Sequence, residues 1–569
     1  MNLPSMIYTS SKKKNNQTIF GGLNHSESAS DGEIYDMKNL ASDNYPYLAP
    51  RAKRRKIYDG TVTDLTSVGN TLYFLTGSIS GAGGELLRSK GVNTEKMAST
   101  EAVGVTFSDS GEILCVMGQR LILRLDGVAG VFDTETCEYR SIAVSMPSTA
   151  TVEDGTLNGE ATQCNRLFFT SYYGPAFRQF REGDGVHITI ENADDAILET
   201  DAVIRELDDE EGTFTFDENI FEGISGSHSV TVERKVPDFS YICACNNRLF
   251  ACNGTTVWAS ALGDPFNWYV YDGISTDSWS VETEDSGEFT ACCEFLGYPH
   301  FFKADAIYKL YGGTASEYQL SKTNAFGVKE GAAGSLGAVG STLFYLSPAG
   351  VCAYSGGYPT VILPPEQMGG NPCYSGAAAT VGYKYFLWVR MTDGYVGIED
   401  NQLREIYVYD TAKGIWHIEE ADVLPACSSG YPGSGQINLL GYSHNGIWLM
   451  GTPAFTASAD DPDANAIGTP EGNFISFAEF GYAFHDTMNA KQLYKLIVRL
   501  LVDSGARIKI YASYDDGPYR IVYETKSRSR QTLSVPIRPK RCDRYRLKIE
   551  GIGNYKIYAI TKEYSVSAK

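Results

Sequence analysis

At residues 340–346 the chain reads Gly-Ser-Thr-Leu-Phe-Tyr-Leu, a turn followed by four large apolar or aromatic side chains. Such a burst is typical of a strand that is buried on both faces, and the glycine allows a tight hairpin turn before it. The pattern returns at six other places, which are residues 69–75, 118–123, 246–250, 297–302, 382–388 and 445–450. A second burst often follows within about ten residues, as at 256–258 and 306–308, and is expected to be the next strand of the same sheet.

The spacing of these copies predicts a β-propeller. The marker residues are Leu72, Leu121, Leu249, Phe301, Leu343, Tyr385 and Ile447, and their separations are 49, 128, 52, 42, 42 and 62 residues. Most separations are close to the 40–50 residues of a four-stranded blade. The 58 glycines and 37 tyrosines also suit many short strands joined by tight turns. We therefore expect an all-β chain with about seven blades.

The separation of 128 residues indicates an insertion, because one blade of about 45 residues leaves roughly 80 unexplained. Residues 150–237 are the most acidic part of the chain and contain alternating strands, so we expect a small β insertion domain there. After Phe484 the pattern changes to period-two alternation, which predicts a C-terminal β-sandwich. The predicted organisation is an extended arm at 1–60, a propeller at 61–149 and 238–485, the insert at 150–237 and the sandwich at 486–569.

Several classes of protein are disfavoured by composition. No apolar run reaches the roughly 18 residues of a membrane helix, and the polar, basic stretch 1–14 does not have the form of a signal peptide. The twelve cysteines form no CxxC pair, and the seven histidines do not show ligand spacing. We therefore expect no metal, no cofactor and no membrane insertion, and folding in a reducing cytoplasm.

Positive charge is concentrated in two places, although the net charge of the chain is −21. One cluster lies in the arm and the other lies on the outward positions of the predicted sandwich. Our candidate subunit-docking residues are Arg51, Arg54, Arg55, Lys56, Arg528, Arg530, Arg541, Arg544 and Arg546. A solvated strand face would explain these charges equally well. Docking onto an acidic neighbouring subunit is the functional hypothesis, and it is favoured over DNA binding because the overall charge repels phosphates.

Catalytic motifs give no support for an enzyme. Residues 513–517, Ser-Tyr-Asp-Asp-Gly, resemble a box of sialidase-like propellers, but an Asp-Gly turn explains them better. Residues 263–265, Gly-Asp-Pro, could form a ligand loop, but a turn anchored by Trp268 is the preferred interpretation. No phosphate-binding loop, HExxH, GxSxG or EF-hand pattern is present.

The motifs along the chain resemble the bacteriophage proteins called stabilization proteins. The chain is also similar in plan to the propeller-based tail accessory and nozzle proteins of short-tailed phages. The motifs of the arm and the sandwich are Phe20–Asn24, Asp36–Leu40, Tyr45–Pro46, Pro50–Arg51, Pro536–Ile537, Arg541–Arg544 and Ile549–Gly551. Those of the propeller are Asn247–Phe250, Gly263–Trp268, Phe301–Lys303, Ile307–Lys309, Gly350–Tyr354, Gly357–Pro359, Tyr409–Thr411 and Gly414–His417.

The resemblance implies a structural role in the virion and no catalytic residues. The expected function is a tail or head–tail ring or nozzle that retains and conducts packaged DNA. Its expected partners are a portal or adaptor and other tail proteins, further copies of the chain in a ring taken as hexameric, and double-stranded DNA in transient contact. The alternative is a receptor- or polysaccharide-binding tail protein that uses Trp268, Trp279 and Tyr519. A propeller glycosidase ranks behind both.

Overall fold

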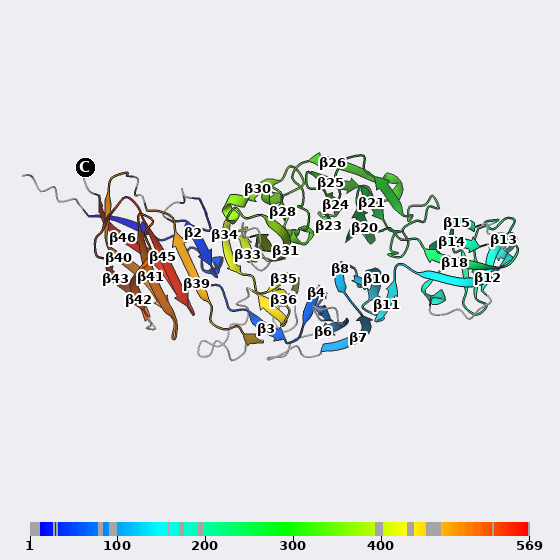
Figure 1. The fold of residues 1–569 in the computed structure, drawn as a ribbon, viewed down its shortest axis with the longest axis horizontal. Coiled ribbons are helices and arrows are strands. Elements are labelled where there is room, and N and C mark those ends of the chain that lie inside the picture. The colour runs from blue at the N-terminus through cyan, green and yellow to red at the C-terminus, as the bar shows by residue number, and fades with distance from the viewer. Residues whose placement is uncertain are drawn as a thin grey trace, which may run out of the picture. The chain divides into compact units, whose positions relative to one another are not determined.

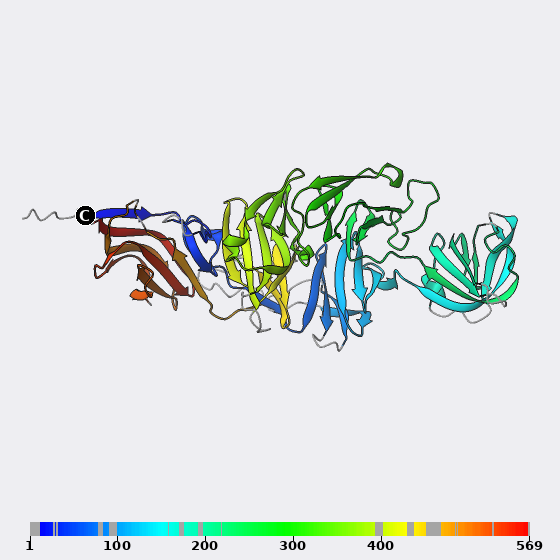
Figure 2. The same ribbon diagram turned by 45° about the horizontal axis from the view of Figure 1, so that its top comes forward.

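The computed structural model describes residues 12–566 except 27–28, 30–31, 78–82, 90–99, 158, 170–175, 192–196, 218, 393–401, 430–436, 451–467, 484, 486 and 526–528. The chain divides into two compact units. Figures 1 and 2 show the strands of both units, coloured by residue number. Unit 1 consists of Met1–Gly60, Lys90–Ala98 and Gly334–Lys569, and unit 2 consists of Thr61–Ser89 and Ser99–Ala333. In the described residues strands dominate, and none of the helices is long and apolar enough to span a membrane.

Unit 2 contains four antiparallel sheets whose four strands follow chain order. Their bounds are β4 (Val62–Val68), β5 (Thr71–Gly77), β6 (Gly84–Ser89) and β7 (Thr100–Phe107); β8 (Gly111–Met117), β9 (Arg120–Leu125), β10 (Val128–Asp133) and β11 (Glu138–Ser141); β19 (Tyr241–Cys245), β20 (Arg248–Asn253), β21 (Thr256–Ala259) and β22 (Trp279–Glu282); β23 (Ala291–Phe295), β24 (Tyr298–Phe302), β25 (Ala306–Tyr311) and β26 (Gln319–Asn324). The first strands β4, β8, β19 and β23 lie next to one another in that order. Such adjacency of first strands is the arrangement of propeller blades.

Unit 1 contains two more sheets of this kind and a related five-stranded sheet whose fourth strand comes from near the start of the chain. Their strands are β27 (Gly337–Val339), β28 (Thr342–Ser347), β29 (Gly350–Tyr354) and β30 (Thr360–Leu363); β31 (Cys373–Val381), β32 (Lys384–Thr392), β33 (Gln402–Asp410) and β34 (Ile415–Glu420); β35 (Leu424–Ser429), β36 (Asn438–Ser443), β37 (Gly446–Met450), β3 (Arg55–Tyr58) and β38 (Thr469–Pro470). The first strands β27, β31 and β35 are again neighbours. The predicted fold class, an all-β propeller of about seven blades with an insert and a sandwich, is confirmed.

In the blades the repeat pattern forms what the sequence predicts, a turn followed by a buried strand. The apolar bursts form the second strand of six blades and the third strand, β37, of the last one, and in β28 Leu343, Phe344, Tyr345 and Leu346 are all buried. The turn residues before them have positive φ, as at Gly340 (60°), a conformation that glycine adopts without strain. A strand with neighbours on both faces buries consecutive side chains, so the sequence shows runs there and not alternation.

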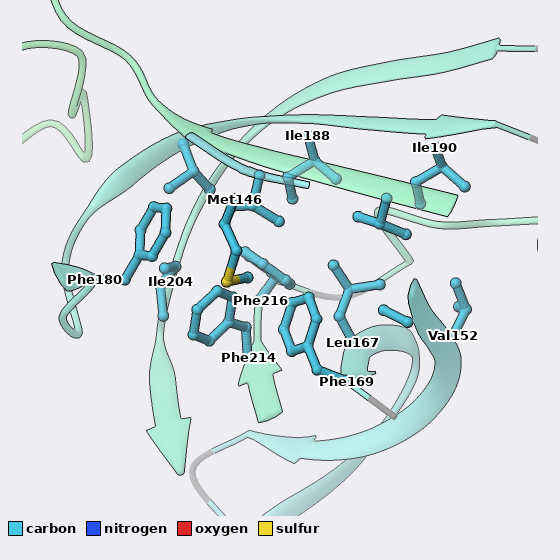
Figure 3. Packing of buried hydrophobic residues seen from close by; sticks show 14 of the residues in the cluster. Met146, Val152, Leu167, Phe169, Phe180, Ile188, Ile190, Ile204, Phe214 and Phe216 are labelled. Carbon is cyan, nitrogen blue, oxygen red and sulfur yellow. The ribbon is translucent and has the colours of Figure 1, made fainter. Parts of the chain in front are cut away.

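The insert is one seven-stranded antiparallel sheet in the order β15-β14-β18-β12-β13-β17-β16 (cyan to teal in Figure 1). Its strands are β12 (Ser145–Leu157), β13 (Glu160–Phe169), β14 (Gly185–Glu191), β15 (Ile197–Val203), β16 (Glu206–Asp208), β17 (Thr213–Thr215) and β18 (Gly226–Arg234). The sheet curls around a phenylalanine-rich core (Figure 3), in which the rings of Phe177 and Phe214 stack at 4.6 Å. Two aromatic planes in offset contact add to the burial of apolar area.

The sandwich consists of two five-stranded sheets. One contains β1 (Lys13–Gln17), β46 (Tyr555–Val566), β40 (Lys491–Val502), β43 (Ser529–Pro536) and β44 (Arg541–Cys542), and the other contains β2 (Ile34–Lys38), β39 (Ile475–Phe480), β45 (Tyr545–Ile552), β41 (Arg507–Tyr514) and β42 (Arg520–Thr525). The sandwich therefore begins at β39, before the predicted boundary at 486. The residues predicted as an arm supply β1 and β2 to the sandwich and β3 to a blade.

The described part of the chain has five short 3-10 helices, which connect strands. They are η1 (Ser42–Asn44), η2 (Phe177–Gln179), η3 (Ala315–Glu317), η4 (Ala333–Ser335) and η5 (Pro365–Met368). Each covers three or four residues, as is usual for this tight helix type.

Candidate functional site

The arginines of the arm are buried in an ionic network of unit 1. Arg51 and Arg54 side chains are 3% and 2% exposed. Arg54 Nη2 lies 3.1 Å from Glu419 Oε2 and donates to the carbonyl of Glu420, and Arg51 pairs with Glu471. The arm is thereby fixed to β34 and to the segment beside β38. These two arginines are engaged inside their own unit, so their charge is not available at a surface.

Burial alone would raise the pKa of Glu419, but the nearby His417 and the charges of Arg54 and Arg51 outweigh it and hold the pKa at about 2. His417 Nε2 lies 3.6 Å from Glu419 Oε1. A buried carboxylate of this kind keeps its charge because two guanidinium groups face it. The network is therefore a structural device whose strength depends on all of its charges being present.

Arg55 and Lys56, the other two candidates of the arm, lie on β3 and are half-buried. Arg55 Nη2 donates to the carbonyl oxygen of Gly468 at 2.9 Å. Lys56 Nζ pairs with Asp59 Oδ1 at 2.9 Å and lies 5.2 Å from the centre of the Trp448 ring. Both side chains reach solvent only in part, so the arm presents less free positive charge than its sequence indicates.

The candidate docking residues of the sandwich lie in different surroundings. Arg528 lies outside the described residues, and Arg530 belongs to β43. Arg546 pairs with Glu479 at 3.0 Å, and its guanidinium lies 4.0 Å from the ring centre of Tyr35 and 3.6 Å from that of Tyr482.

Arg544 lies beside Arg546 and pairs with Asp516, and its guanidinium is 4.2 Å from the Tyr482 ring centre. Arg541 is exposed on the short strand β44. The structure thus brings Arg544 and Arg546 together on one aromatic platform. It leaves Arg541 as the candidate that faces solvent among those whose side chains are described.

A cleft of about 1050 Å³ lies within unit 1. Four cationic and four acidic side chains line it together with amides and aromatic rings: Lys38, Arg54, Arg404, Lys548, Glu420, Asp422, Glu471, Glu550, Asn39, Asn445, Asn473, His444, Trp448, Phe474 and Phe477. Six of these residues lie on the strands β2, β34, β37, β39 and β45, and most of the others lie on the segments that connect strands. Aromatic rings and amide side chains that line one cleft could hold a neutral polar ligand.

Most carboxylates of this cleft already have partners. Glu471 pairs with Arg51 and accepts the backbone N–H of Arg54 at 2.8 Å, and Glu420 accepts from Asn39 Nδ2 at 3.3 Å. Glu550 lies 4.0 Å from Lys509 Nζ. A pair of free carboxylates across an open site, as a glycosidase requires, is therefore not built here by these three residues.

The described residues contain no group of three His, Cys, Asp or Glu side chains that could hold a metal ion. The twelve cysteines are free, and several cluster between two blades of unit 2. Burial raises the pKa of Cys292 and Cys293 well above the ordinary range of a thiol. A thiol whose pKa is raised by apolar surroundings is a poor nucleophile, so these cysteines pack as small apolar side chains.

The motif at Gly263–Trp268 joins the insert to a blade. Asp264 Oδ1 accepts the backbone N–H of Phe266 at 3.0 Å, and Asn267 Oδ1 accepts the backbone N–H of Gly185 in the insert at 3.0 Å. Trp268 is fully buried, and its Nε1 donates to the carbonyl of Pro265 at 3.1 Å. This motif is therefore a turn with an anchor, and Trp268 offers no surface for a sugar.

Sequence reasoning missed the centre of that joint. Arg234 and Asp184 form an ion pair whose side chains are 0% and 1% exposed. Arg234 also donates to the carbonyl oxygens of Ser141 and Ile142, at 3.1 and 3.2 Å, at the end of the preceding blade. Lone charged residues in an acidic segment carry no pattern, so no sequence signal separates these two from solvated neighbours.

The other candidate sugar-binding aromatic residues and the Ser-Tyr-Asp-Asp-Gly motif have structural roles. Trp279 and Tyr519 are half-buried, and the Trp279 ring meets that of Tyr318 edge to face at 5.4 Å. Residues 513–517 form the hairpin between β41 and β42, where Asp515 and Asp516 have φ of 49° and 58°. Asp and Asn tolerate this conformation in turns, which explains the motif without chemistry.

Comparison with known proteins gives fold likeness alone. No family model and no curated protein matches the chain. Among solved structures it is similar to a glycoside hydrolase, with 12% identity over 89% of this chain and 99% of the other at a TM-score of 0.21. It is also similar to the WD40 domain of SCAP from fission yeast, with 9% identity over 71% and 98% at 0.29. An exo-beta-1,3-galactanase from Phanerochaete chrysosporium matches with 9% identity over 89% and 100% at 0.22. Likeness at this level says nothing about activity.

Proposed function

We propose that the chain is a structural protein of a bacteriophage virion, in the tail or head–tail region, where a ring of copies retains and conducts packaged DNA. The proposal starts from the resemblance of its motifs to stabilization proteins and includes no catalytic role. It is supported by the use that the fold makes of those motifs.

The observation that carries the proposal is that three of the resembling motifs lie where separate elements of the fold are joined. The segment Phe20–Asn24 is held on a blade, where the Leu23 N–H donates to the Trp416 carbonyl at 2.9 Å. Arg51, the last residue of another motif, pairs with Glu471, and Gly263–Trp268 holds the insert. Motifs in enzymes converge on a pocket, whereas motifs at joints keep elements in register. Such use suits a protein whose task is mechanical.

The proposal is tested in the phage whose genome encodes the chain. Gold-labelled antibody and electron microscopy of purified virions are expected to locate the protein on the tail axis. Particles made without the gene are expected to package DNA and then lose it, measured as nuclease-sensitive DNA released over time. Absence of the protein from virions, or stable full particles in its absence, would refute the proposal.

The second candidate is a tail protein that binds polysaccharide, and the cleft of unit 1 favours it. Trp448 and Phe474 line that cleft together with amide side chains, a combination that suits sugar rings. Particles without such a protein would be full and stable but would fail to adsorb to cells. The same gene deletion therefore separates the two candidates.

A further inference from the structure

Charge is segregated between two domains of the chain. Residues 145–234, the insert, contain 19 acidic and 5 basic residues, a net charge of −14. Residues 486–569, most of the sandwich, contain 18 basic and 8 acidic residues, a net charge of +10. The two domains belong to different units. Because the two domains carry opposite net charges of this size, the insert of one copy attracts the sandwich of another.

The positively charged sandwich contains a groove of about 460 Å³. It lies between the first residues of β42 and the segment that follows β43, which are edge strands of the two sandwich sheets. Arg520, Arg538 and Lys540 line it, and no carboxylate does. Its apolar wall includes Ile521, which is 55% exposed. The groove thus combines apolar surface with uncompensated positive charge.

The cations of this groove differ from others in the sandwich. Arg507 pairs with Glu524 and Arg544 pairs with Asp516, whereas Arg520, Arg538 and Lys540 have no ion pair among the described residues. The nearby Asp515 accepts the backbone N–H groups of residues 543 and 544, at 2.8 and 3.2 Å.

Tyr514 lines the same groove. Its hydroxyl is buried and has no hydrogen-bond partner within the described part of the chain. The Tyr514 ring centre lies 5.6 Å from Lys540 Nζ, so an aromatic wall stands beside the cations of the groove. A carboxylate that enters the groove would meet its three cations.

The insert contains an acidic hairpin whose charge is opposite to that of the groove. The turn between β16 and β17 carries four consecutive exposed carboxylates, Asp208, Asp209, Glu210 and Glu211. Glu211 pairs with Arg166 at 2.6 Å, and Asp209 lies 4.0 Å from Arg178. Four carboxylates in succession, within an insert whose net charge is −14, make this hairpin a concentrated negative surface.

We propose that the cationic groove of the sandwich in one copy binds the acidic β16–β17 hairpin of a second copy. The two surfaces differ, so the contact is head-to-tail, and such contacts generate closed rings when their rotation closes. DNA would satisfy the groove and leave the acidic hairpin unmatched, whereas a second copy satisfies both. The inference rests on the proposed function, since it supplies the contact that would build the ring.

Charge-reversed variants of the full chain test this contact by sedimentation velocity over a concentration series. The groove variant is Arg520→Glu/Arg538→Glu/Lys540→Glu, and the hairpin variant is Asp208→Lys/Asp209→Lys/Glu210→Lys. The unmodified chain is expected to associate at about 50 mM NaCl and to dissociate at about 500 mM, because salt screens exposed charges. Each variant alone is expected to weaken association on the order of 100-fold, and a chain carrying both sets is expected to recover it.

The matched control is Lys13→Glu/Arg499→Glu/Lys556→Glu, which makes the same change in net charge on the sandwich away from the groove and is expected to associate normally. Circular dichroism checks that each variant folds, and if one variant does not fold, the other still tests the contact through its own loss of association. A monomeric unmodified chain, or unchanged association in the groove variant, overturns the inference. The inference is overturned in favour of phosphate binding if the groove variant no longer binds a double-stranded DNA fragment and the chain with both sets does not recover self-association. Presence in virions is measured separately, so failure of this contact leaves the proposed function intact.

Discussion

The substitution Glu419→Gln would remove the charge that holds the arm in unit 1. Glu419 faces Arg51 and Arg54, and all three side chains are 4% exposed or less. Its pKa is held at about 2, against an ordinary value of 4.5. That difference corresponds to roughly 3 kcal/mol of stabilisation at neutral pH, and removing one member of a buried ionic group costs about 3–5 kcal/mol. We expect a loss of that size, about 3 kcal/mol.

Because unit 1 is only part of the chain, hydrogen exchange of individual peptides is a better measure than a single melting curve. Amides of β3 and β34 are expected to open about 3 kcal/mol more easily in the variant, whereas amides of the insert keep their protection. In the unmodified chain this stabilisation is present above pH 4.5 and is lost as pH falls toward 2, because the folded pKa is the lower one.

The matched control is Glu138→Gln, which breaks a pair with Arg140 whose side chains are 62% and 38% exposed. Exposed pairs contribute at most about 1 kcal/mol, so this variant should exchange almost normally near its site. Equal effects of Glu419→Gln and Glu138→Gln would refute the argument that burial makes the arm network strong. Unchanged exchange of β3 in Glu419→Gln would refute the role of the network itself.

Three further perturbations test other parts of the fold. Asp184→Ala leaves the buried Arg234 without its partner and is expected to destabilise the joint of the insert by about 3–5 kcal/mol, measured as faster proteolysis there, while the exposed Asp201→Ala serves as control. Burial raises the pKa of Asp64 to about 6, so the stability of its blade should fall by up to about 3 kcal/mol as pH rises from about 4 to 6, and Asp64→Asn should flatten that dependence in thermal melts. Gly22→Ala would bring a Cβ within 2.8 Å of the backbone of Trp416, so exchange at the arm should rise by about 1–3 kcal/mol, and unchanged exchange would contradict the close packing.

The blades were predictable because their signal is local. A run of four large apolar side chains after a turn residue fits a strand covered on both faces, and β28 shows that burial at every position. The start of the sandwich was less visible. In β39 the side chains of Ser476, Ala478 and Phe480 are buried in alternation, but only Ala and Phe register as apolar, so the period-two signal is short.

The role of the arm could not be predicted from sequence. Strand β3 reads Arg-Lys-Ile-Tyr, and its partner strand β37 lies almost 400 residues further along the chain. A run of like charges indicates a solvated surface, yet Arg51 and Arg54 are buried because Glu419 and Glu471 compensate them. Compensation at such separations leaves no spacing pattern, so the docking hypothesis for the arm included two residues that the fold uses internally.

The pairing of β3 with β37 has a consequence for the order of synthesis. Arg55 pairs with Leu449, and β1 pairs with β46 through Lys13 and Tyr564. During translation the three strands of the arm therefore leave the ribosome long before their partners exist. Contacts so distant in sequence form late and slowly, because loop closure must precede the gain in pairing energy. The last blade and the sandwich are then completed only when the nascent chain is nearly finished, so the arm is the part of the protein that a chaperone would have to shield longest.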